Sequence, residues 1–105
     1  MTREPIFKCE HTLYLMLRDG SKPFDMRKYD LSDDRIRRLA WGHARPRSFG
    51  ETRWVPMETV VSFQDKETGE IQMFEYQGME FAPWAPGWCF LLLGRQLRDG
   101  VPVED

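Results

Sequence analysis

The segment 35–53 concentrates residue types that contact phosphate groups, nucleic-acid bases or protein partners. It carries six arginines against one acidic residue, Glu51, for a local charge of +5. Its candidate binding residues are Arg35, Trp41, Arg45, Arg47, Phe49, Arg53 and Trp54. Guanidinium groups bind phosphates and aromatic rings stack on bases, so the segment suits nucleic acid. Arginine and aromatic side chains also dominate the hot spots of protein–protein interfaces.

A solvated loop is the alternative to a functional patch in this segment. If residues 33–41 are helical, Asp33 lies beside Arg37 at i,i+4 spacing, and Asp34 lies beside Arg38. Pairs of this kind stabilise a helix by only about 0.2–0.5 kcal/mol. The other arginines have no acidic partner close in sequence, yet a run of charge is usually a solvated surface. Both interpretations stay open.

The segment 58–80 has the opposite charge. Six acidic residues face Lys66 alone, for a local charge of −5. The two segments could neutralise each other across the fold. If they lie on different faces, either could steer a charged partner.

The cysteines and histidines are candidate metal ligands or nucleophiles. Cys9 and His11 would share one side of a strand. His43 and Cys89 could complete a two-cysteine, two-histidine zinc site. However, the chain has no CxxC pair, no visible group that orients a Cys–His pair, and no phosphate-binding glycine loop. The sequence therefore favours a protein without catalytic residues, metal, cofactor or disulfide, while an active site without a motif stays open.

Trp84 is a further candidate binding residue, because it lies in the proline- and glycine-rich segment 78–87. Together with Trp88 it could form an aromatic recognition surface. The alternative is that these two indoles cap an exposed end of the core.

Length and composition predict one soluble domain spanning 1–105, with less ordered termini at 1–8 and 101–105. Aromatic residues make up 13% of the chain, which argues against disorder. The net charge of −2 gives no overall attraction to nucleic acid or to an anionic membrane. With no apolar run long enough for a membrane span or a secretory signal, we expect a cytoplasmic protein. Eleven arginines against four lysines, with no asparagine, indicate a GC-rich prokaryotic genome or mobile element.

Hydrophobic patterns predict strands at residues 11–17, 24–29, 54–64, 70–77 and 88–93. The first two would form a hairpin. Residues 57–64 and 70–77 would form another, turning at 65–69. Residues 43–53 and 78–87 have no clear period and contain proline and glycine, which predicts loops.

A single short helix is predicted between Ser32, a suitable N-cap, and Gly42, which is placed to end it. Ile36, Leu39 and Ala40 share one face of this helix. That face must dock on a sheet, because an isolated helix of this length is unstable in water.

The predicted architecture is α+β, with an antiparallel sheet of four or five strands and one short helix packed on one face. One such helix cannot cover both faces of the sheet. A loop or a second chain must cover the other face, so a homodimer is one expectation. The sequence favours a small non-enzymatic binding or accessory protein that acts through a protein–protein surface. The alternative is a nucleic-acid-binding module that uses the arginine-rich segment 35–53.

Overall fold

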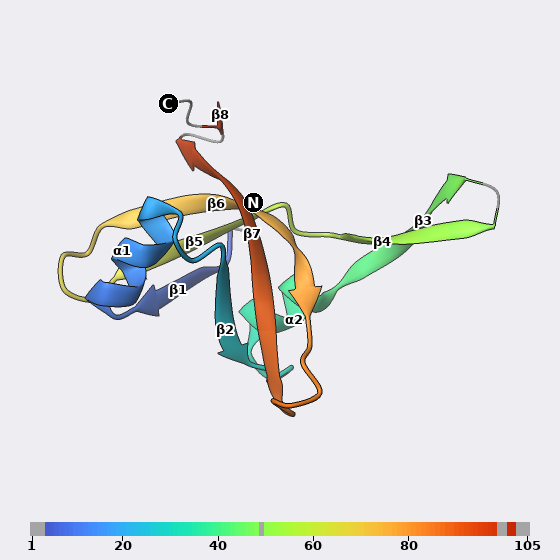
Figure 1. Cartoon of the computed structure of the whole chain (residues 1–105), viewed down its shortest axis with the longest axis horizontal. Coiled ribbons are helices and arrows are strands. Elements are labelled where there is room, and N and C mark those ends of the chain that lie inside the picture. The colour runs from blue at the N-terminus through green and yellow to red at the C-terminus, as the bar shows by residue number, and fades with distance from the viewer. Residues whose placement is uncertain (1–3, 49, 99–100, 103–105) are drawn as a thin grey trace.

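The computed structural model describes residues 4–48, 50–98 and 101–102, with the side chains of 43–48, 51 and 53 outside the described part. The elements, in chain order, are β1 (Ile6–Cys9), α1 (His11–Asp19), β2 (Phe24–Lys28), α2 (Asp34–Ala40), β3 (Gly42–Ser48), β4 (Glu51–Pro56), β5 (Val60–Asp65), β6 (Ile71–Glu80), β7 (Trp88–Arg98) and β8 (Val101–Pro102) (Figure 1). Within the described ranges, neither helix is long and apolar enough to cross a lipid bilayer.

The main sheet has the strand order β1-β5-β6-β7-β2, and β8 pairs with β7 off this path. β1 and β5 run parallel, whereas the other pairs of this sheet are antiparallel. The predicted α+β class is therefore confirmed, but the sheet has six strands and one parallel pair, and two helices accompany it in the described part of the chain. The parallel edge strand, β1, comes from residues that were expected to belong to a less ordered terminus.

Residues 11–17 form the helix α1 rather than the predicted strand. Tyr14 and Leu17 are buried while Leu13 and Met16 are exposed, so this segment has a helical rather than a two-residue period. The helix ends at Gly20, whose φ of 84° lies in the left-handed region and whose N–H donates to Leu17 O at 3.3 Å. The prediction was wrong because a short run of leucine and methionine does not distinguish a strand from a buried helix turn.

Residues 24–28 do form a strand, β2, but its partner is not residues 11–17. β2 pairs antiparallel with β7, with Met26 opposite Phe90 in the register. The predicted hairpin is therefore wrong, because helix formation removed one of its two strands. The predicted strand at 88–93 is confirmed and extends to Arg98 as β7.

The helix α2 is confirmed, with a different N-cap. Asp33, not Ser32, accepts the hydrogen bond from Arg35 N–H at 3.0 Å. Ser32 instead bonds the Asp30 carboxylate through its N–H and its hydroxyl. The helix ends at Ala40, and its buried face holds Ile36 and Leu39 as predicted, whereas Ala40 is only half-buried.

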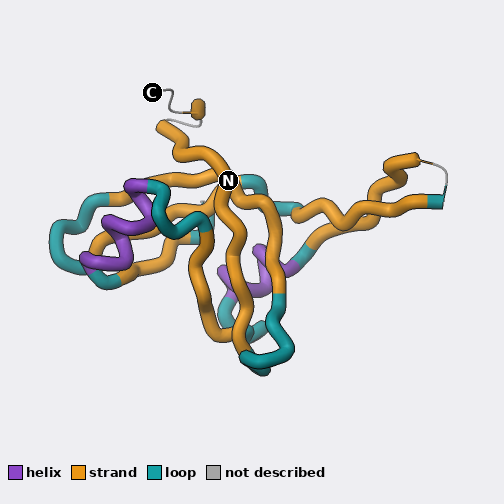
Figure 2. Tube along the Cα trace, in the orientation of Figure 1, coloured by secondary structure: helices purple, strands orange, loops and turns teal. Residues whose placement is uncertain are grey.

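Residues 42–56 form a two-stranded antiparallel ribbon, β3–β4, although residues 43–53 were predicted to be a loop. The ribbon extends away from the main sheet (Figure 2). Pro46 is tolerated because the ribbon is open on both sides and its register shifts between Pro46 and Ser48. The predicted strand 54–64 is consequently divided, with Pro56 ending β4 and Val60 beginning β5.

The predicted hairpin of residues 57–64 and 70–77 is confirmed as β5–β6. The register runs from Val60 opposite Glu75 to Gln64 opposite Ile71. Gly69 in the turn has a φ of 79°, a value that favours glycine. β6 continues to Glu80, so the segment predicted as a loop begins three residues later than expected. Both helices bury apolar side chains in one core with Phe63, Phe74 and Leu91 of this sheet.

Candidate functional site

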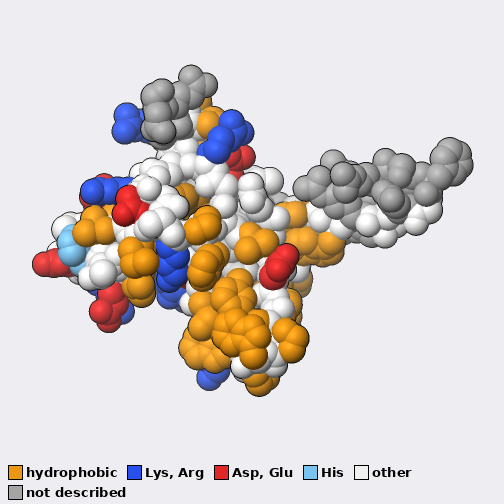
Figure 3. All heavy atoms as spheres, viewed as in Figure 1, with side chains coloured by type: hydrophobic (Ala, Val, Ile, Leu, Met, Phe, Trp, Pro, Cys, Tyr) orange, Lys and Arg blue, Asp and Glu red, His pale blue; other side chains and the backbone are white. Residues whose placement is uncertain are grey.

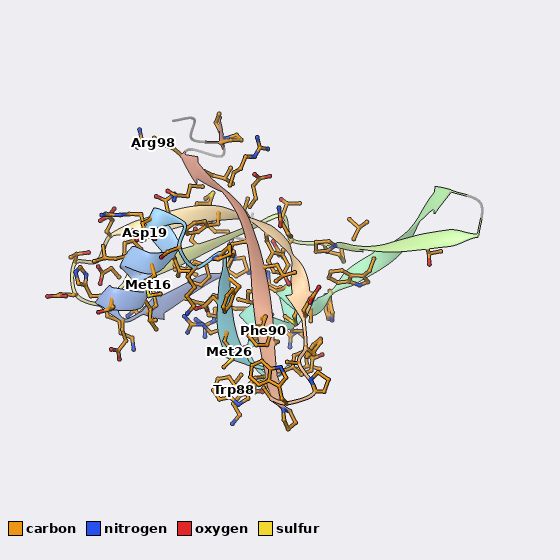
Figure 4. All side chains as sticks on the ribbon, in the orientation of Figure 1. Met16, Asp19, Met26, Trp88, Phe90 and Arg98 are labelled. Atoms are coloured by element: carbon orange, nitrogen blue, oxygen red, sulfur yellow. The ribbon has the colours of Figure 1, made fainter. Side chains whose placement is uncertain are left out.

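An exposed row of apolar side chains lies on the outer face of β2 and β7. Phe24 and Met26 of β2 stand beside Phe90 and Trp88 of β7, because their register pairs Phe24 with Leu92 and Met26 with Phe90. Trp84 lies in the loop before β7 and is 75% exposed. We call Phe24, Met26, Trp84, Trp88 and Phe90 the aromatic face. Figure 4 shows Met26, Phe90 and Trp88 together at one end of β7.

Phe90 contacts two other rings of the aromatic face. It lies edge-on to Phe24 with 5.8 Å between the ring centroids, and its centroid is 5.9 Å from that of Trp84. The Lys22 ammonium sits 5.7 Å from the Phe24 ring, within the range of a cation–π contact. Apolar side chains gather in the same region in the space-filling view (Figure 3).

The loop that carries Trp84 is held by its own backbone. Ala85 N–H donates to Ala82 O at 3.0 Å, and Trp88 N–H donates to Ala85 O at 3.2 Å. Pro83 and Pro86 restrict the backbone further. Trp84 is therefore presented to solvent from a constrained turn, which lowers the entropy lost when a partner binds it.

The aromatic face is exposed because both helices pack on the other side of these strands. The inner face of β7 carries Cys89 and Leu91, which are fully buried in the core. Leu17 of α1 and Leu39 of α2 belong to that same core. The outer side of β2 and β7 is therefore the side of these strands that the two helices leave exposed.

Arg35, predicted as a free binding residue, is bonded within the fold. Its Nε and Nη2 donate to the Asp33 carboxylate at 3.0 and 2.7 Å. Its Nη1 donates to Ile6 O at 2.9 Å, and its guanidinium lies 4.3 Å from the centre of the Phe7 ring. The hydrogen bonds from Arg35 keep the pKa of Asp33 below its ordinary value. Arg35 therefore connects α2 to β1 and is not available as a free cation.

The other arginines of α2 also have acidic partners, although not the predicted ones. Arg37 pairs with Asp34 at i,i+3 rather than with Asp33 at i,i+4. Arg38 pairs with Glu58 at 2.9 Å, which joins the basic segment to the acidic one. The charge on this helix is therefore largely compensated within the fold.

The remaining predicted site residues lie on or near the ribbon. Trp41 is 55% exposed, with the Arg37 guanidinium 5.8 Å from its ring. Trp54 packs against Gly42 and lines a cavity of about 190 Å³ with Phe81. Arg45 is paired directly with Arg53 in the backbone register. The side chains of Arg45, Arg47 and Arg53, and the whole of Phe49, lie outside the described residues.

The aromatic face thus includes one residue of the predicted site, Trp84, and Trp88, which was considered with it. Phe24, Met26 and Phe90 were missed. The alternation in residues 24–28 was visible in the sequence, but it did not indicate which strand would lie beside them. Their assembly depends on the pairing of β2 with β7, more than 60 residues apart in the chain.

The cysteines and histidine of the described chain are poorly placed for nucleophilic chemistry. Burial raises the pKa of Cys9, and it raises the pKa of Cys89 to about 11, so both thiols are protonated at neutral pH. His11 Nδ1 lies 2.6 Å from Asp65 Oδ2, and this hydrogen bond raises the pKa of His11. In the described ranges, no three potential ligands gather to hold a metal ion.

No protein-family model matches the sequence, and no curated protein is similar to it.

Proposed function

We propose that this chain is a small non-enzymatic binding protein that holds a protein partner on the aromatic face. The observation that carries the proposal is the contact of the half-buried Phe90 with two exposed rings, Trp84 and Phe24. Contiguous exposed apolar surface of this kind marks interaction sites in soluble proteins. Compensation of the α2 arginines by Asp33, Asp34 and Glu58 weakens the case for a basic groove.

Tryptophan is among the residue types that contribute most to protein–protein affinity. Removing a hot-spot tryptophan typically weakens binding by about 2 kcal/mol or more. Trp84 contacts Phe90, and Pro83 and Pro86 restrict the loop that carries Trp84. Little ordering of this surface is therefore required on binding.

The test is capture of partners from lysate of the source cells by the immobilised protein. A partner retained by the unmodified protein should be lost with Trp84→Ala and kept with Arg45→Ala. Titration of the identified partner should give a Kd about thirtyfold weaker for Trp84→Ala. Unchanged affinity of the Trp84→Ala protein would contradict the proposal, and capture that nuclease abolishes would favour the alternative below.

A nucleic-acid-binding module that uses the arginine-rich segment is the second candidate. It is favoured by the ribbon β3–β4, whose register pairs Arg45 with Arg53 on strands that extend from the main sheet. Two-stranded ribbons of this shape fit the major groove of DNA. If this function operates, DNA affinity should fall by about tenfold or more between low and moderate salt, and Arg45→Ala should reduce that dependence.

A further inference from the structure

The outer edge of β1 is covered by arginine side chains. Arg35 Nη1 donates to Ile6 O at 2.9 Å. Arg27 Nη2 donates to Lys8 O at 3.1 Å. Both guanidinium groups also lie over the ring of Phe7, which is 1% exposed. This edge of the main sheet therefore has carbonyl groups that are already bonded, a common way of preventing unwanted strand pairing.

The opposite edge of the sheet is formed by β2, and its backbone is open. Leu93 N–H donates to Pro23 O at 3.0 Å, and Tyr29 N–H donates to Gly87 O at 2.8 Å. These bonds establish that the odd-numbered residues of β2 turn their backbone groups toward β7. The outward groups belong to Phe24, Met26 and Lys28. Within the described part of the chain, no backbone group bonds to them.

A cavity of about 310 Å³ runs beside this open edge. Met26 and Lys28 line one side of it, while Phe7 of β1 and Ile36 of α2 line the other. Trp88 also lines the cavity, so the cavity adjoins the aromatic face. An edge strand with a groove between it and a helix can receive an extended peptide as an additional strand.

We propose that an extended segment of the protein partner pairs with the outer edge of β2, with apolar side chains on the aromatic face and carboxylates toward the cavity. This inference rests on the proposed function, because it names how the partner is held there. Alternate side chains of a strand point to opposite sides. Every second residue of the segment therefore packs beside Phe24 and Met26, and the residues between them lie beside Arg27.

The cavity is lined by three cations, Arg27, Lys28 and Arg35, and by two carboxylates, Asp30 and Asp33, so the net charge of its lining is positive and favours carboxylates at these positions. Arg27 and Arg35 are ion-paired with Asp25 and Asp33, and Nη1 of Arg27 is the atom of that guanidinium that makes no hydrogen bond to a described group. Lys28 forms no ion pair with a described residue. Asp30, which also lines the cavity, accepts from Ser32 N–H at 2.9 Å and from its hydroxyl at 2.6 Å. Its charge is thus already stabilised locally.

The probe is a short synthetic peptide that alternates valine and glutamate, added to the full-length protein. Amide hydrogen exchange measured by NMR is the readout. On saturation, the amides of Phe24, Met26 and Lys28 should become protected, whereas those of Asp25 and Arg27, already bonded to β7, should change little. The same peptide N-methylated on alternate residues should bind at least about tenfold more weakly, because it lacks the donors that pair with β2.

A protein variant tests the same contact from the other side. Met26→Pro removes an outward N–H without removing a bond to β7, and proline is tolerated at such edge positions. Its affinity for the peptide should fall about tenfold. If circular dichroism shows that Met26→Pro is misfolded, the N-methylated peptide still tests backbone pairing with β2, because that experiment uses the unmodified protein.

Three results would overturn the inference. They are no peptide binding at millimolar concentration, equal affinity for the N-methylated peptide, and protection of Phe24, Met26 and Lys28 that rises with protein concentration alone. The last result would mean that a second copy of the chain occupies the edge. None of these results contradicts the proposed function as long as Trp84→Ala impairs partner capture. Unchanged partner capture by Trp84→Ala would contradict the proposed function itself.

Discussion

Removing the hydroxyl of Tyr76 should destabilise the protein measurably. Tyr76 is 4% exposed, and its hydroxyl donates to Leu39 O at 2.8 Å, at the last turn of α2. In Tyr76→Phe this bond is lost and a buried carbonyl loses its partner, which costs about 1–3 kcal/mol. For a domain of this size, each kcal/mol lowers the Tm by about 4–8 °C. Urea unfolding followed by tryptophan fluorescence measures the change in free energy directly.

Tyr14 provides the matched control. Its side chain is equally buried, at 1% exposed, but its hydroxyl makes no hydrogen bond to a described residue, and the nearby Glu70 carboxylate is too poorly placed to form one. Burial raises its pKa to about 12. Tyr14→Phe removes a polar atom that gains nothing from burial, so the stability should be unchanged or higher. A Tyr14→Phe variant that loses as much stability as Tyr76→Phe would refute the reasoning.

Three further outcomes are expected. Asp33→Ala should lower the free energy of unfolding by about 1 kcal/mol, and Ser32→Ala by less, because Asp33 caps α2; the comparison needs only urea titrations of both variants. Folding raises the pKa of His11, so protonated His11 contributes to the free energy of unfolding. This contribution is fully present below pH 6.5 and is lost as the pH rises through the raised pKa. Folding lowers the pKa of Asp65, so the ionised Asp65 carboxylate stabilises the folded state above pH 3.8, and this contribution is lost as the pH falls through the lowered pKa. In unfolding curves recorded over a pH series, His11→Gln should flatten the loss of stability that His11 causes as the pH rises. Gly42→Ala should loosen the β3–β4 ribbon, since an added Cβ meets a carbonyl oxygen of β4, and faster amide exchange in the ribbon would reveal it.

The elements that were predicted correctly are those defined by signals close together in sequence. The β5–β6 hairpin follows from two alternating runs separated by a turn that contains Gly69. The helix α2 follows from acidic residues at its start and from the spacing of Ile36 and Leu39. Its cap was misplaced by one residue, because Ser32 and Asp33 are both good N-caps and only the Asp30–Ser32 turn decides between them.

The failed predictions concern segments whose structure depends on distant residues. Residues 11–17 are apolar enough for either a strand or a helix, and the choice was made by the core that receives Tyr14 and Leu17. Residues 43–53 contain Pro46 and Gly50, which indicate a loop, yet a ribbon open on both sides accommodates them. In both cases a weak local preference was overridden by the pairing or burial available in the folded chain.

What the sequence by itself determined is the fold class, the β5–β6 hairpin and the presence of tryptophans in a constrained loop. The expectation that a loop or a second chain covers the other face of the sheet stays a prediction. Only the tertiary structure decided where the aromatic face lies, because Phe24 and Phe90 become neighbours through β2–β7 pairing, which no local pattern specifies. The same holds for Arg35, whose charge is compensated by Asp33 and whose remaining donor is directed to β1. The sequence gives the residue types directly, but contacts between distant strands depend on how the whole core packs.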